Sequence, residues 1–322
     1  MSNKNIIANV MVYGDIHLWS KNYGAHRNYP EETLYCFEEV VKFAEEHKVT
    51  HAIHLGDFSY GRFHTLEYRL AVEDKLARLY AYTNGNSYSL RGNHDYAGYG
   101  MTEYEYYITK GLLKPSTNLK LGIVNISMID YKKHLETEIL PVSDDTISVV
   151  LTHDYFKFSD TKLPEYGNAI LLDEFEQWFG VDYLICGHIH NYELFKGKVI
   201  KDSRSHDMVV CFPGCLSRPA YREGHMDEKG HIVLMTIFDD ATMEIDFPEI
   251  PLWPLEKAFI LEEKKIIEER KAAKSVDVSD IVNTLNSHER TIGNPEDIIM
   301  AKTDIPLKYR EKAIELLQRA GE

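Results

Sequence analysis

The chain has 322 residues, of which 44% are hydrophobic and 27% are charged, and its formal net charge is −15 at pH 7. This composition excludes wholesale disorder, and the apolar runs are shorter than the roughly 20 residues that a membrane-spanning helix needs. The acidic balance argues against a simple cationic nucleic-acid binder, but not against a protein that meets phosphates through bound metal ions.

The N-terminal segment and the cysteines indicate a cytoplasmic protein with no membrane association. MSNKNIIANVMVYGD lacks a small-residue cleavage site, so it is typical of a first strand rather than of a signal peptide. The cysteines include no C-x-x-C pair and are too few for a disulfide framework: Cys36, Cys186, Cys211 and Cys215. We therefore expect them to be buried thiols.

Up to about residue 190, short apolar runs alternate with amphipathic segments. The runs predict strands at Ile6–Tyr13, His51–Leu55, Tyr88–Leu90, Thr146–Leu151 and Val181–Cys186. Between them, Glu31–Lys48 and Leu66–Tyr82 carry apolar residues at helical spacing. Helices that alternate with strands predict a layered α/β fold.

After residue 190 the pattern becomes rich in strands, and the composition changes again near residue 250. Strands are expected at Tyr192–Val199, Met208–Phe212, His231–Phe238 and Ala241–Phe247, as a second sheet packed on the first. Pro248–Pro254 is typical of a linker, so we expect a catalytic domain over 1–250 and a helical extension over 251–322. The helical patterns in that extension are Glu256–Lys274, Val278–Leu285 and Leu307–Arg319.

Each expected strand of the first half ends in residues that can bind metal. The clusters are, in order, Asp15-x-His17, Gly56-Asp57, Gly92-Asn93-His94-Asp95, His153-Asp154 and Gly187-His188-x-His190. Ligand sites in layered α/β folds form just beyond the carboxyl ends of strands, so these clusters should converge on one crevice. The glycines allow tight turns and close backbone approach there.

The residue types indicate the metal and the reaction. Carboxylate, imidazole and amide oxygen suit Mn²⁺, Fe²⁺, Zn²⁺ or Mg²⁺, and about seven ligands are too many for one closed zinc site. They suffice for two ions that share a bridging carboxylate, for which Asp57 is the natural candidate. Such a pair generates hydroxide near neutral pH and holds the attacking and leaving oxygens of a displacement at phosphorus.

The order D-x-H, G-D, G-N-H-D, H, G-H-x-H resembles the calcineurin-like metallophosphoesterase superfamily, over roughly residues 6–240. The resemblance implies a four-layer α/β/β/α sandwich of two mixed β-sheets flanked by helices. It also implies that Asp15, His17, Asp57 and His190 hold one ion, and that Asp57, Asn93, His153 and His188 hold the other. His94 would contact phosphate and protonate the leaving group, and Asp95 would orient His94.

Two stretches resemble SbcD-type DNA-repair exonucleases in particular: G-D-I-H-L at Gly14–Leu18 and the segment Phe212–Ile237. The protein phosphatases of the superfamily instead carry G-D-x-x-D-R-G and G-N-H-E. The sequence departs from the nucleases at Cys215, where serine is usual, and at His231, which follows Lys229-Gly230. Its compact size is similar to that of phage recombination-nuclease subunits.

This resemblance implies a manganese-dependent DNA exo- or endonuclease, dimeric, whose C-terminal helices bind an SMC-like ATPase of the SbcC type. Alternatives are a small-molecule or cyclic-nucleotide phosphodiesterase and a metal-bearing scaffold subunit with little turnover. DNA phosphates could meet Arg62, His64, Arg218 and Arg222, although loop arginines exposed to solvent are an equally good interpretation.

Overall fold

The computed structural model describes residues 4–19, 21, 28–63, 65–96, 100–162, 169–202, 204–218 and 229–258. These residues belong to one compact unit, Met1–Ile260. The helical patterns expected at Val278–Leu285 and Leu307–Arg319 lie outside the described residues, as does nearly all of Glu256–Lys274. The binding of a partner through them therefore stays a prediction.

The first sheet has strand order β14-β13-β1-β2-β3-β4, and β15 pairs with β13. Strands β1 to β4 run parallel to one another, and β13 is antiparallel to β1, β14 and β15. The bounds are β1 Ile6–Tyr13, β2 His51–His54, β3 Ser87–Ser89, β4 Lys114–Pro115, β13 Lys229–Phe238, β14 Met243–Asp246 and β15 Glu249–Pro251.

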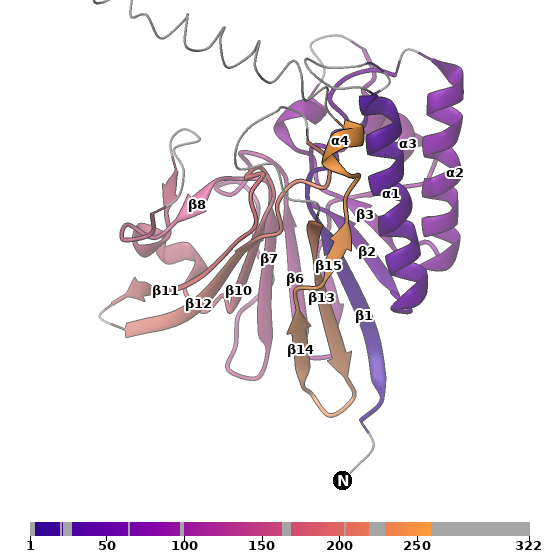
Figure 1. The fold of residues 1–322 in the computed structure, drawn as a ribbon. Coiled ribbons are helices and arrows are strands. Elements are labelled where there is room, and N and C mark those ends of the chain that lie inside the picture. The colour runs from indigo at the N-terminus through magenta and orange to yellow at the C-terminus, as the bar shows by residue number, and fades with distance from the viewer. Residues whose placement is uncertain are drawn as a thin grey trace, which may run out of the picture. The chain divides into compact units, whose positions relative to one another are not determined.

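Three helices cover the outer face of this sheet: α1 Tyr29–Glu46, α2 Leu66–Tyr82 and α3 Glu103–Thr109 (Figure 1). Asn28 and Thr65 accept a hydrogen bond from the first turn of α1 and α2, which explains where these two helices begin. Alternate residues of β1 point to opposite faces, so Met11 packs under the helices while Val12 enters the core between the sheets.

The second sheet has strand order β11-β12-β10-β7-β6-β5. Its strands are β5 Leu119–Leu121, β6 Val124–Ile129, β7 Ile147–Thr152, β10 Tyr183–Cys186, β11 Glu193–Lys201 and β12 Arg204–Phe212. Its inner face shares one apolar core with the first sheet, and this core includes Ile126, Val149 and Ile185. The protein is thus an α/β fold with two mixed sheets, as expected.

Two details of the expected fold are wrong. The strands after residue 190 do not form a sheet of their own, because β11 and β12 join the second sheet while β13, β14 and β15 complete the first. No α-helix covers the outer face of the second sheet in the described residues. That layer consists of the short 3-10 helices η2 Leu172–Glu174 and η3 Glu176–Trp178 and the strands β8 Phe156–Lys157 and β9 Ile170–Leu171.

The proline-rich segment Pro248–Pro254 is also not a free linker. It contains β15, and Leu252 next to it is buried. The short helix α4 Leu255–Ala258 follows directly and lies near one end of α1 (Figure 1). The catalytic unit therefore extends past residue 250.

The structure bears on the predictions about the cysteines and about membrane-spanning helices. All four cysteines are free and buried, as predicted. Among the helices that the structure describes, none has both the length and the apolar character needed to cross a bilayer.

Candidate dimetal site

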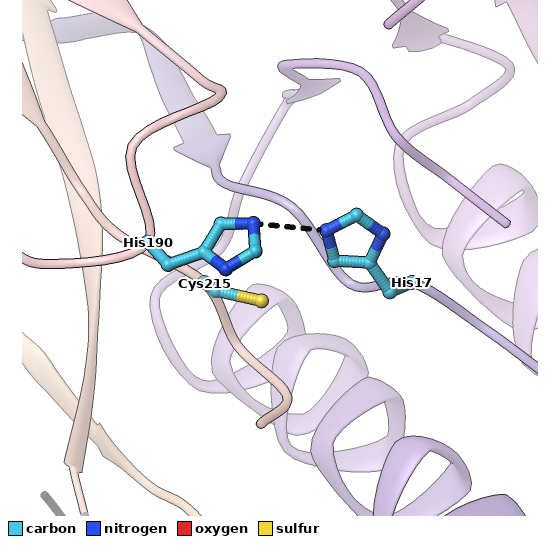
Figure 2. A group of neighbouring side chains, drawn as sticks. All are labelled: His17, His190 and Cys215. Carbon is cyan, nitrogen blue, oxygen red and sulfur yellow. Dashed lines mark hydrogen bonds between the residues drawn. The ribbon is translucent and has the colours of Figure 1, made fainter. Parts of the chain in front are cut away.

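One group of side chains lies beyond the ends of β1 and β10. His17 Nε2 is 3.1 Å from His190 Nε2, and Asp15 Oδ2 is 3.6 Å from His190 Nε2. Asp57, which follows β2, places Oδ2 3.9 Å from His17 Nε2. Figure 2 shows the two imidazole rings facing each other across this point. These four side chains could hold one divalent ion.

A second group adjoins the first through the same carboxylate. His153, at the end of β7, places Nε2 3.3 Å from Asp57 Oδ2 and 3.1 Å from Asn93 Oδ1. His188 Nδ1 is 2.9 Å from the same Asn93 oxygen. The structure thus brings all seven predicted ligands together, with Asp57 Oδ2 between the two groups.

The hydrogen bonds of His153 identify the nitrogen that is available for a metal. Its Nδ1 lies 2.9 Å from the backbone oxygen of Leu55. Because a carbonyl only accepts, Nδ1 is the donor, and in a neutral ring Nε2 carries a lone pair. That lone pair faces two oxygens, of Asp57 and Asn93, which are themselves acceptors. A cation on Nε2, a proton or a metal ion, satisfies such a cluster of acceptors.

The pKa shifts of the buried acids also indicate that the site needs positive charge. Asp15, Asp57 and Asp95 are all almost fully buried. Burial, with a contribution from Asp57, raises the pKa of Asp15 to about 8 and that of Asp95 to about 7. Burial alone would lower the pKa of His153, but Asp57 and Asp15 outweigh it and raise this pKa to about 10. Clustered buried carboxylates need positive charge, and the donor set fits two divalent ions.

The backbone that carries the ligands is strained. His17, Asp57 and His188 have φ values of 47°, 54° and 75°, a region that residues other than glycine rarely adopt. Backbone N–H groups also fix the carboxylates: His188 donates to both oxygens of Asp15, and His94 donates to Asp57 Oδ1 at 2.8 Å. Strain held in place by the surrounding structure is typical of functional sites.

Glycines in the ligand turns leave room that no side chain could share. A Cβ on Gly92 would lie 2.2 Å from both the nitrogen and the Oδ1 atom of Asp57. A Cβ on Gly187 would lie 2.6 Å from His153 Nδ1 and 2.8 Å from Asp15 Oδ1. The close approach expected from the sequence is therefore present at these turns.

Replacing Gly92 with alanine should displace Asp57. We expect Gly92→Ala to bind Mn²⁺ about 10–100-fold more weakly and to lose about 1–3 kcal/mol of unfolding free energy. Gly111→Ala is the control: its Cβ meets nothing within 4 Å, so only the positive φ of 74° should cost stability, about 1 kcal/mol. Calorimetric titration with Mn²⁺ and urea unfolding measure both effects. Unchanged Mn²⁺ affinity in Gly92→Ala would contradict the packing argument.

His94 lies at the exposed edge of the site. Its side chain is 38% exposed, and its Nε2 is 3.8 Å from Asp57 Oδ2. The ring stacks on Tyr60 at 4.8 Å between centroids. One ring nitrogen of His94 also lies within 4.8 Å of ligand atoms of His17 and Asp57, so its distances alone would allow it to bind metal.

The expected role of Asp95 is wrong. Its carboxylate accepts hydrogen bonds from the backbone N–H groups of Gly92, Phe58 and Ser59, at 2.9 to 3.4 Å. Its partners are thus the two turns that carry Asp57 and Asn93, and it does not hydrogen-bond to His94. Asp95 supports the positions of the ligand turns, and His94 is oriented by Tyr60 instead.

The candidate substrate contacts divide into three cases. Arg62 is exposed, and its guanidinium lies beside Gly100. Arg218 is 2% exposed and its Nε is paired at 2.8 Å with Glu32 Oε1, so the expectation of a solvent-exposed arginine is wrong there. Arg218 also lines a pocket that begins at His190, so its contact with substrate stays a prediction. His64 and Arg222 lie outside the described residues.

Several aromatic residues near the ligands were not anticipated. Trp19 packs on Tyr60 at 4.7 Å because the bridge between Leu18 and Ser59 holds their two turns together. The Tyr131 ring lies 6.1 Å from that of His153 and 6.0 Å from that of His188. Their sequence positions carry no metal-ligand pattern, so only the tertiary structure reveals them.

Comparison with protein families gives one match. The model of the calcineurin-like phosphoesterases matches residues 8–192, which is more than half of the chain and contains all seven predicted ligands. The chain belongs to this family.

This calcineurin-like phosphoesterase is therefore a metal-dependent hydrolase of phosphate esters with a site for two metal ions. No curated protein matches the chain. Among solved structures, the chain is similar to a dimetal phosphatase from Danio rerio, with 11% sequence identity and a TM-score of 0.44. That similarity covers 77% of this chain and 100% of the Danio rerio chain.

Proposed function

We propose that this phosphoesterase is a DNA nuclease of the SbcD type, an exo- or endonuclease subunit in repair or recombination. The observation that carries the proposal is the loop of the SbcD-like segment Phe212–Ile237. Cys215 N–H donates to the oxygen of His190 at 3.0 Å, and Leu216 N–H donates to that of Asp15 at 2.8 Å. The segment that resembles the nucleases thus supports two of the metal-binding turns.

The seven ligands would hold two ions, most suitably Mn²⁺. Asp15, His17 and His190 would bind one, Asn93, His153 and His188 the other, and Asp57 both. When bound, the ions would supply an activated water and Lewis-acid stabilisation of the oxygens on phosphorus. The chain's own part is to orient the ligands through Asp95, Leu55 and the backbone N–H groups.

His94 would supply the proton for the leaving oxygen. It is half-exposed at the edge of the site, so a substrate oxygen can approach its ring. Its Nε2 lies 3.8 Å from Asp57 Oδ2, and stacking on Tyr60 restricts the rotation of the ring. A histidine held in this way is suited to general acid catalysis.

Space beside the metal groups supports a substrate larger than phosphate alone. A pocket of about 220 Å³ begins at His190 and is lined further out by Tyr192, Lys229 and His231. Tyr192 and His231 stack at 3.9 Å, and Lys229 adds a positive charge paired with Glu249. Aromatic faces and a cation beside a phosphoryl site are features that suit a nucleotide unit.

A cleavage assay tests the proposal. Full-length protein should degrade linear or hairpin DNA with Mn²⁺, more slowly with Mg²⁺, and not with a chelator. His94→Gln prepared in the same way is the control for contaminating nuclease. Hydrolysis of bis(p-nitrophenyl) phosphate or cyclic nucleotides with no cleavage of linear, hairpin or circular DNA would instead identify a small-molecule phosphodiesterase. Two bound ions with no turnover on any substrate would identify a scaffold subunit.

We further propose that the protein is a homodimer and that it binds an SMC-like ATPase of the SbcC type through residues 261–322. The support is the sequence resemblance together with the position of that segment. The family match ends at residue 192, and the described fold is complete by α4, so the helical patterns beyond it are not needed for the ligand set.

A further inference from the structure

Cys215 lies beside one of the two metal groups. It follows β12 in the loop Pro213–Ser217, and its backbone N–H is bound to the oxygen of His190. One ring nitrogen each of His17 and His190 and the sulfur of Cys215 all lie within 4.8 Å of one another. Figure 2 shows the sulfur pointing toward the space between the two rings.

These distances are compatible with one shared ion. Zinc bonds of about 2.0–2.3 Å to nitrogen and sulfur place two ligand atoms of a tetrahedral ion roughly 3.5 Å apart. The Nε2 atoms of His17 and His190 are 3.1 Å apart, and the sulfur lies within 4.8 Å of one ring nitrogen of each. Cys215 is 9% exposed, so water competes little for the position.

The other contacts of this thiol are weak. Its sulfur contacts Ser217, through the Oγ atom at 3.8 Å and through the backbone N–H. The remaining cysteines differ, because Cys36, Cys186 and Cys211 belong to none of the metal-competent groups among the described residues. Cys215 is thus distinguished by its position and not by burial, which all four share.

We propose that Cys215 Sγ is a further ligand to the ion held by Asp15, His17 and His190. Thiolate is a soft ligand, so this position would favour Zn²⁺, Fe²⁺ or Co²⁺ over Mn²⁺ and Mg²⁺. The other position, with the amide oxygen of Asn93, would keep its preference for harder ions. The two positions would then differ in the metal that each prefers.

Binding of the thiol involves a simple exchange of bonds. The S–H bond of Cys215 breaks, a sulfur–metal bond forms, and the proton passes to solvent without any change of oxidation state. The inference concerns the metal centre alone, and it holds whether the substrate is DNA or a small diester.

Cobalt substitution tests this inference by absorption spectroscopy. Full-length apoprotein titrated with Co²⁺ should show a near-ultraviolet sulfur-to-cobalt charge-transfer band together with visible d–d bands. Cys215→Ser and Cys215→Ala should lose the near-ultraviolet band and keep the d–d bands of the remaining ligands. Cys211→Ser, a change at a cysteine buried between the sheets, should keep both. Circular dichroism verifies that each variant is folded.

Competition between metals gives a second readout. Removal of a metal's supporting groups costs 10–100-fold in affinity, so the preference for Zn²⁺ over Mn²⁺ should fall at least about 10-fold in Cys215→Ser. A wild-type spectrum with d–d bands and no charge-transfer band would overturn the inference but leave the dimetal site intact. The absence of all cobalt bands would overturn both.

Discussion

Asp57→Asn should abolish phosphodiester hydrolysis and reduce the bound metal below two ions per chain. Asp57 Oδ2 lies between the two ligand groups, 3.3 Å from His153 Nε2 and 3.9 Å from His17 Nε2. Asparagine keeps the shape but removes the negative charge that would bridge two cations. We expect activity on an aryl phosphodiester to fall by at least about 10²–10³-fold, the scale of losses when an active site loses electrostatic stabilisation.

Asp154, which directly follows the predicted ligand His153, provides the control for Asp57. Asp154 is also buried, but it binds the backbone N–H of Lys132 and the Nδ1 atom of His134 at 2.8 Å, away from the ligand groups. Asp154→Asn should therefore keep both ions. Metal content by plasma mass spectrometry and kcat on the aryl diester measure the two variants side by side. Wild-type turnover in Asp57→Asn would show that no shared carboxylate is needed.

The kcat of His94→Gln should be lower by about 10²–10⁴-fold, and the variant should keep both metal ions. The reason is that the side chain is positioned to donate a proton at the edge of the site and is not needed to complete either ligand group. The loss should be larger for DNA than for bis(p-nitrophenyl) phosphate, because nitrophenolate leaves readily without a proton. Single-turnover rates on both substrates, with metal content, test this.

Tyr60→Phe is the matched control for His94, because it keeps the ring that stacks on the imidazole at 4.8 Å. This variant should retain most of the activity. Loss of one ion from His94→Gln would assign His94 as a ligand, which its distance from His17 and Asp57 allows. Equal losses on both substrates would instead argue against proton donation to the leaving group.

The convergence of the seven residues could be predicted from a general property of parallel strands. β1 pairs in parallel with β2 and β2 with β3, and β7 pairs in parallel with β10, so their carboxyl ends share an edge in each sheet. Residues just after such strands must converge. The bounds of β1 and α2 are also as predicted, since β1 is a mostly apolar run and α2 carries apolar residues at helical spacing.

The errors arise where a role depends on tertiary contacts. Val124–Ile129 forms a fully buried strand that is not among the strands predicted from the sequence. No local pattern indicates that β13 returns to pair with β1, more than 200 residues away. Asp95 and Arg218 each have a partner that is distant in the sequence, Phe58 in a ligand turn and Glu32 in α1, which no local pattern indicates.

The most direct test of the two-metal account is a crystal structure of the full-length protein grown with excess Mn²⁺, with anomalous diffraction data collected at the manganese edge. The account predicts two anomalous peaks per chain. One should contact Asp15, His17 and His190, the other should contact Asn93, His153 and His188, and the carboxylate of Asp57 should lie between them. A single peak, or peaks away from these side chains, would contradict it.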